Sequence, residues 1–246
     1  MLKPLIDGRF VLECQLEGKP CSFMIDTGSD RSRIGNEIIR ALKLRKEYSN
    51  GEPFVQGGME IDGQYMISPK FFPEDNNFNL SVINTHLVKY GMEPISGLIG
   101  IDYLRMRSFT FDYRNNVPKG CLNGTLGIRF NQVLQIARDD DSLPFIRVKI
   151  DGDENTLLLD TGSNCSSLKY EKDSWEAQPV EKELCTSYSC TKTELRIASN
   201  LPIAITDSIC PKADFYVSND RQILGMNAFK NLAIHYCDCG NYYIAN

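Results

Sequence analysis

Residues 23–29 read Phe-Met-Ile-Asp-Thr-Gly-Ser, and residues 157–163 read Leu-Leu-Leu-Asp-Thr-Gly-Ser. Each copy places an aspartate, Asp26 or Asp160, directly after three apolar residues, which is typical of a buried strand that ends in a turn. One copy alone would predict only a tight turn. The two copies lie 134 positions apart, and a motif that recurs in matching surroundings indicates an internal duplication.

The similarity continues on both sides of the two motifs. Upstream, Glu17-Gly18 corresponds to Asp151-Gly152, and each pair lies between apolar-rich runs, as in a tight β-hairpin. Downstream, Gly97-Leu98-Ile99-Gly100 corresponds to Gln222-Ile223-Leu224-Gly225 at a spacing of 125. The same elements in the same order predict two halves of one topology.

The pattern elsewhere is that of a mostly β protein, with short runs of Val, Ile, Phe and Tyr bounded by Gly, Pro and Asn. We expect a β lobe over residues 1–125 and a second over residues 126–246, related by a pseudo-twofold axis with the active site between them. The linker is expected between Arg114 and Pro144.

One helix is expected in the first half, with Asn36 as its N-cap. Its buried stripe is predicted to consist of the apolar residues Ile38, Ile39, Ala41 and Leu42.

Composition restricts the partners. The 246 residues carry a net charge of −5, which disfavours nucleic acid and anionic membranes. No apolar run approaches the roughly 18–20 residues of a membrane span. The N-terminal residues do not resemble a secretory signal, so a cytoplasmic location is expected.

The chain has nine cysteines. Their spacing does not match a zinc pattern, and we expect free thiols, no metal and no cofactor. Pairing around Glu17-Gly18 would place Cys14 opposite Cys21, and both are expected to be reduced. A redox or metal protein built on the cysteines stays open as an alternative. A cysteine peptidase would need a histidine partner for Cys165, and neither His86 nor His235 belongs to a repeated motif.

Two carboxylates that face each other across an axis support acid–base chemistry. They cannot both ionise cheaply, so one keeps a proton while the other draws a proton from water. Gly28 and Gly162 would let the backbone approach the carboxylates. Thr27 and Thr161 would lock the two loops together by hydrogen bonds across the axis.

Two further loop residues, Ser29 and Ser163, each follow their aspartate by three positions. A hydroxyl in that place could reach the outer carboxylate oxygen and lower the pKa of the pair, which predicts an acidic optimum.

The repeated Asp-Thr-Gly-Ser, followed by Leu98-Ile99-Gly100 and by Ile223-Leu224-Gly225, resembles the retropepsin-like aspartic peptidases. The resemblance extends over most of both halves and implies a fused pair of retropepsin-like β lobes with Asp26 and Asp160 as catalytic residues. It implies an aspartic endopeptidase that acts on polypeptides as a monomer. The alternative is a non-catalytic peptide- or protein-binding module on the same fold.

The resemblance is uneven around the flap, the hairpin that closes over bound peptide in this family. Gly57 and Gly58, within residues 55–61, resemble the tip of such a flap, although an ordinary glycine-rich turn would fit too. The second half has no Gly-Gly pair, and residues 185–190 stand in its place. A second flap is therefore expected to be short, remodelled or absent.

Overall fold

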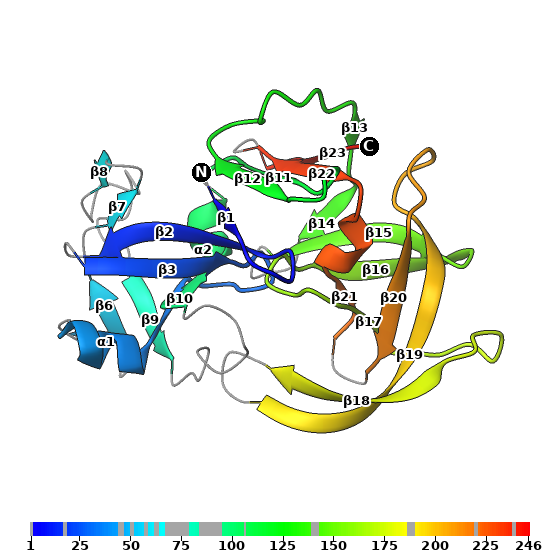
Figure 1. Cartoon of the computed structure of the whole chain (residues 1–246), viewed down its shortest axis with the longest axis horizontal. Helices are drawn as coiled ribbons and strands as arrows, with labels where there is room; N and C mark the ends of the chain where they lie inside the picture. Colours follow the sequence, from blue (N-terminus) through cyan, green and yellow to red (C-terminus); the bar gives the residue numbers. More distant parts are fainter. Residues whose placement is uncertain are drawn as a thin grey trace.

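The computed structural model describes residues 2–16, 19–43, 47–49, 52–56, 59–61, 64–66, 79–83, 95–105, 107–138, 143–185, 190–218, 221–237 and 240–246. The protein is mostly β, as expected, and the strands in these ranges form three sheets (Figure 1). The described residues include no helix long and apolar enough to cross a membrane.

The first sheet belongs to the N-terminal half and has ten strands. They are β1 (Lys3–Pro4), β2 (Phe10–Leu16), β3 (Lys19–Ile25), β4 (Arg33–Gly35), β5 (Glu47–Ser49), β6 (Glu52–Gln56), β7 (Met59–Ile61), β8 (Gln64–Met66), β9 (Asn79–Ile83) and β10 (Gly97–Ile99). β2 and β3 form an antiparallel hairpin, and β10 lies parallel to β3 on its other side. β3 is therefore an interior strand of the sheet. Its last three residues are all apolar and all buried, as is typical of strands covered on both faces.

The second sheet belongs to the C-terminal half and has eight strands. They are β14 (Ile136–Arg138), β15 (Pro144–Ile150), β16 (Asp153–Leu159), β17 (Ser166–Leu168), β18 (Gln178–Cys185), β19 (Cys190–Ala204), β20 (Lys212–Val217) and β21 (Ile223–Leu224). The hairpin β15–β16 with the parallel strand β21 repeats the arrangement of β2, β3 and β10. The duplication seen in the sequence is thus also present in strand order and direction.

The third sheet is built by both halves. Its order is β12-β11-β22-β23-β13. Its strands are β11 (Phe109–Asp112), β12 (Lys119–Leu122), β13 (Gln132–Val133), β22 (Ala233–Tyr236) and β23 (Tyr242–Ala245). In Figure 1 this sheet lies above the other two, close to both chain termini. Its aromatic residues pack closely, as in the stacked rings of Phe109 and Tyr236, whose centroids are 5.3 Å apart. The segment expected as a linker therefore contains three strands, β12, β13 and β14, and is part of the fold.

Three short helical elements complete the part of the chain that the structure describes: α1 (Asn36–Leu42), α2 (Ile101–Leu104) and the 3-10 helix η2 (Met226–Phe229). The prediction for α1 was wrong in two details. Gly35 is the N-cap and no side chain caps the helix, so Asn36 is its first residue. Ala41 is exposed, while Ile39 is buried and Ile38 and Leu42 pack partly against the core. A helix of only two turns packs a narrow stripe of side chains against the sheet, and Ala41 lies outside that stripe.

The cysteines only partly follow expectation. Cys14 and Cys21 lie opposite each other in the β2–β3 hairpin, and both are free thiols as predicted. The general expectation of free thiols is wrong at Cys237, which is disulfide-bonded. Trp175 is buried, and its indole N–H donates to Asp151 Oδ2 at 2.9 Å.

Candidate active site

The two aspartates are delivered to one place by equivalent strands. Asp26 follows β3, and its backbone N–H donates to Ile99 O of β10 at 2.9 Å. Asp160 follows β16, and its N–H donates to Leu224 O of β21 at 3.1 Å. Each loop thus begins from a backbone that is fixed by a parallel neighbouring strand.

The threonines join the two loops across the halves, as expected. The Thr27 N–H donates to Thr161 Oγ1 at 3.0 Å, and the Thr161 N–H donates to Thr27 Oγ1 at 3.1 Å. Each hydroxyl also donates to a carbonyl of the other half, Thr27 to Leu159 O at 2.6 Å and Thr161 to Ile25 O at 2.9 Å. Both threonines are buried. These four bonds hold the two aspartates at a fixed separation without using the carboxylates.

The glycines bring each loop against the other carboxylate. A Cβ atom on Gly28 would lie 2.6 Å from Asp160 Oδ2, and one on Gly162 would lie 2.6 Å from Asp26 Oδ1. No side chain fits in either place. Each glycine N–H also donates to the aspartate of its own loop, at 2.9 Å in both halves. The glycines are therefore required for the close approach of the two carboxyl groups.

The electrostatics of the pair are unequal. Burial raises the pKa of Asp26 well above its usual range, and the negative charge of Asp160 and a hydrogen bond between the two carboxyl groups raise it further, against the opposing effects of the Gly28 N–H and the charge of Arg33. Burial also raises the pKa of Asp160, but hydrogen bonds from Asp26 and from the N–H groups of Gly162 and Ser163 oppose that rise, as does the charge of Arg9. Double ionisation of the pair is therefore disfavoured, so the two carboxyl groups are suited to share one proton.

A second layer of polar contacts supports each loop. In the first half, Ser32 Oγ donates to Asp102 Oδ1 at 2.7 Å and accepts from the Gly100 N–H at 3.0 Å. In the second half, Ser166 Oγ donates to Asn227 Oδ1 at 2.7 Å and accepts from the Gly225 N–H at 3.0 Å. The match of the two serines was visible in the sequence, but their partners in α2 and η2 were not predicted.

Arg9 was also missed by sequence reasoning. Its guanidinium donates to Gly162 O at 2.9 Å and pairs with Asp7 Oδ2 at 2.6 Å. An arginine of the N-terminal half thereby supports the Asp160 loop of the C-terminal half. The corresponding residue of the second half is Leu143, so the duplication gave no signal for this contact.

The serine hydroxyls do not reach the carboxylates, which corrects the expectation for Ser29 and Ser163. Ser29 Oγ donates to Arg31 O and Ser163 Oγ donates to Cys165 O, each at 2.8 Å. A hydroxyl has a single proton, so a serine that donates to a backbone carbonyl cannot also donate to the aspartate. The serines therefore stabilise the turn. The hydrogen bonds that lower the pKa values of the pair come from backbone N–H groups and not from the serine hydroxyls.

We expect the Ser29→Ala, Ser163→Ala double variant to shift the titration of the aspartate pair by less than about 0.3 pH units. It should lower the free energy of unfolding by about 1 kcal/mol for each lost bond. A titration of the ¹³C-labelled Asp carboxyl groups by NMR measures the first quantity, and urea unfolding measures the second. An upward shift of half a unit or more in both apparent pKa values would show that the hydroxyls do bind the carboxylates.

Gly57 and Gly58, the predicted tip of a flap in the first half, lie outside the described residues. Of the strands on either side of them, β6 pairs with β5 and β9, whereas β7 pairs with β2 and β8. The flap therefore stays a prediction.

A long hairpin occupies the region of the second half where the flap is expected to be short, remodelled or absent. β18 and β19 pair in register from Gln178 opposite Ile197 to Cys185 opposite Cys190. A side chain of β18 reaches the loop after Asp160, because Lys182 Nζ lies 3.0 Å from Cys165 Sγ and 2.8 Å from the hydroxyl of Tyr216.

The histidines do not contribute to this site within the described residues. His235 Nδ1 lies 2.9 Å from Thr110 Oγ1 in the third sheet, and His86 lies outside the described residues. No protein-family model matches the chain, and no curated protein sequence matches it either.

Proposed function

We propose that the protein is an aspartic endopeptidase with Asp26 and Asp160 as its catalytic pair. The observation that carries the proposal is the mutual approach of the two Asp-Thr-Gly loops, in which the glycine of each loop lies against the carboxylate of the other. A pair of partly exposed carboxyl groups that shares one proton is suited to activate water and polarise a carbonyl in the same step.

In the proposed cycle Asp26 carries the shared proton and Asp160 is its ionised partner, since the pKa of Asp26 is raised well above its usual range. The ionised Asp160 accepts a proton as water adds to the carbonyl carbon of the scissile bond. The protonated Asp26 donates its proton to the carbonyl oxygen, which gives a neutral tetrahedral intermediate. Collapse of the intermediate breaks the C–N bond, and the leaving nitrogen takes the proton from Asp160. Asp26 recovers its proton from the intermediate as the carboxyl group forms, so the enzyme returns to its initial state.

The architecture fits two retropepsin-like lobes in one chain. The hairpins β2–β3 and β15–β16, the parallel strands β10 and β21, and the strands β11 and β22 of the shared sheet all recur in the same order. β11 and β22 pair antiparallel with each other, as strands related by a twofold axis do. The resemblance of the repeated motifs to retropepsin-like peptidases supports the same assignment.

A digest of a proteome-derived peptide library tests the function, with cleavage sites identified by mass spectrometry. We expect internal cleavage of polypeptides, and the same activity per mole of chain from nanomolar to micromolar enzyme, because one chain supplies both carboxylates. Loss of specific activity on dilution, together with dissociation of a dimer seen by light scattering, would contradict the monomeric site. Binding of peptides without any cleavage would instead identify a non-catalytic binding module.

A further inference from the structure

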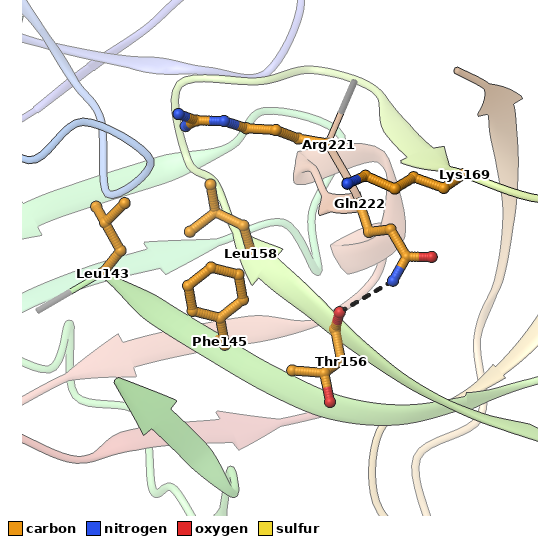
Figure 2. Close-up of a pocket in the computed structure, with 7 residues that line it drawn as sticks. All are labelled: Leu143, Phe145, Thr156, Leu158, Lys169, Arg221 and Gln222. Atoms are coloured by element: carbon orange, nitrogen blue, oxygen red, sulfur yellow. Dashed lines mark hydrogen bonds between the residues drawn. The ribbon is translucent and has the colours of Figure 1, made fainter. Parts of the chain in front are cut away.

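A cavity of about 340 Å³ opens on the C-terminal half, next to the strand that leads to Asp160. Figure 2 shows its floor, formed by the apolar side chains of Leu143, Phe145 and Leu158, and the cations Lys169 and Arg221 on one rim. Phe145 and Leu158 face each other across β15 and β16.

The first half has the same floor, but there it is closed. The registers of β2, β3 and β10 place Val11, Met24 and Leu98 side by side, where the second half has Phe145, Leu158 and Ile223. Val11, Met24 and Leu98 are at most 5% exposed, and they form a small apolar cluster with Leu5 and Ile95. By contrast, Phe145 and Ile223 are partly exposed, while Leu158 between them is 2% exposed.

The residues that close the floor in the first half are not repeated. The positions that correspond to Leu5 and Ile95 are Asp139 and Asp220, which lie outside the described residues. The two apolar closing residues of the first half thus have no apolar counterpart in the repeat.

The two rim cations are also specific to this half. Lys169 corresponds to Gly35, and Arg221 corresponds to Ser96, which is buried. Lys169 and Arg221 are exposed, and neither forms an ion pair within the part of the chain that the structure describes. An apolar floor beneath two unpaired cations suits a group that has an apolar stem and ends in a carboxylate.

The cavity is within reach of the catalytic pair. Asp160 directly follows β16, and the N–H groups of Leu158 and Asp160 donate to Gln222 O and Leu224 O, which are two residues apart. The extended pairing thus continues through Asp160, so the side chains of Leu158 and Asp160 point to the same side, about 6.6 Å apart along the chain. The side chains of an extended substrate that lie on one face have the same spacing. A side chain in this cavity therefore belongs to a residue within about two positions of the bond at the carboxylates.

We infer that this cavity is a specificity pocket that takes an acidic side chain of the substrate, glutamate above all, on one side of the scissile bond. Lys169 and Arg221 bind the carboxylate, and Phe145 and Leu158 contact the methylene groups. The inference rests on the proposed function, and it adds the substrate class. The corresponding face of the first half is apolar and closed, so no acidic preference is expected on the other side of the bond.

Pairs of peptides that differ only by Glu or Gln test the pocket, since these side chains have the same shape. One such pair is made for each of the two positions on either side of a cleaved bond. We expect kcat/KM to favour Glu about tenfold at one position, on one side only, because a charge-assisted hydrogen bond discriminates by about that factor. The preference should weaken at high ionic strength.

Two double variants test whether the preference for Glu over Gln comes from this pocket. The Lys169→Gln, Arg221→Gln double variant should reduce the Glu/Gln ratio to about one. The Lys212→Gln, Lys230→Gln variant removes two exposed lysines elsewhere in the same half and is the matched control. It should retain the wild-type ratio.

A ratio near one at every position, or a preference unchanged in the Lys169→Gln, Arg221→Gln variant, would overturn the pocket while leaving the peptidase function intact. If no peptide is cleaved, the proposed function fails, and the pocket is still tested by fluorescence anisotropy with labelled Glu and Gln peptides. Equal binding of the two peptides would then reject it. Binding of free 3-phenylpropionate in competition with the Glu peptide would show that the pocket recognises the carboxylate itself.

Discussion

The substitutions Asp26→Asn and Asp160→Asn are each expected to lower kcat/KM for peptide hydrolysis by about 10³-fold or more. An amide cannot accept the proton of the attacking water, nor can it share a proton with the remaining carboxylate. Because the two groups titrate as a pair, the double variant should be little worse than either single variant. Steady-state cleavage of a peptide from the library digest measures all three.

Loss of activity should not come from loss of the fold. Since the pKa of Asp26 is raised above its unfolded value, protonation favours the native state. That contribution is fully present below about pH 4 and is lost as the pH rises through the folded-state pKa. The amide side chain of the Asp26→Asn variant carries no charge at any pH. The free energy of unfolding of this variant should therefore exceed that of the wild type at neutral pH, and the difference should shrink towards pH 4.

Urea unfolding at several pH values measures this difference, and Asp173→Asn, at an exposed position, is the matched control. The control should change neither activity nor the pH dependence of stability. Substantial cleavage by Asp26→Asn or Asp160→Asn at wild-type stability would rule out a shared catalytic pair. Lower stability of Asp26→Asn at neutral pH would show that Asp26 is ionised in the native protein.

Gly225→Ala is expected to lower the free energy of unfolding by about 3 kcal/mol or more. Its φ of −87° is accessible to alanine, so the backbone conformation itself causes no strain. The new Cβ would lie 2.6 Å from the carbonyl carbon of Cys165 and 2.9 Å from Ser163 O, which are backbone atoms of the loop that follows Asp160. The strand and the loop would have to separate, and overpacking of this kind is among the more destabilising changes.

Two other glycine variants serve as comparisons for Gly225→Ala. Gly100→Ala should have a similar effect, because its Cβ would lie 2.6 Å from the carbonyl carbon of Arg31 in the first half. Gly124→Ala should be nearly neutral, since its nearest neighbour, Cys121 Sγ, is 3.5 Å away. Chemical denaturation of the three variants makes the comparison. A Gly225→Ala protein as stable as Gly124→Ala would mean that the loop and β21 are not in contact.

Much of the fold could be predicted because the informative residues are local and occur twice. The buried strands before Asp26 and Asp160 are apolar runs, and the hairpin turns carry an acidic residue and a glycine. The parallel strands are each followed by a glycine. Each signal depends only on neighbouring residues and on the period of a strand. The same signals placed both aspartates, both glycines and both threonines of the candidate site.

The errors fall where a side chain has more than one possible partner, or where its partner lies far away in the sequence. Ser29 and Ser163 could have bonded a carboxylate or a carbonyl, and only the geometry of the turn selects the carbonyl. The contact of Arg9 with Gly162 joins positions 153 residues apart, with no counterpart in the repeat.

The sequence by itself thus determined that two equivalent aspartate loops exist, because a repeated motif is a property of the chain alone. Only the tertiary structure decided how the two halves differ. The same strands form a closed apolar face around Met24 and, in the second half, an open cavity beside Phe145. The reason is that the closing residues, Leu5 and Ile95, are contributed by other segments of the chain, and their place over the floor is a matter of packing in three dimensions and not of the local pattern.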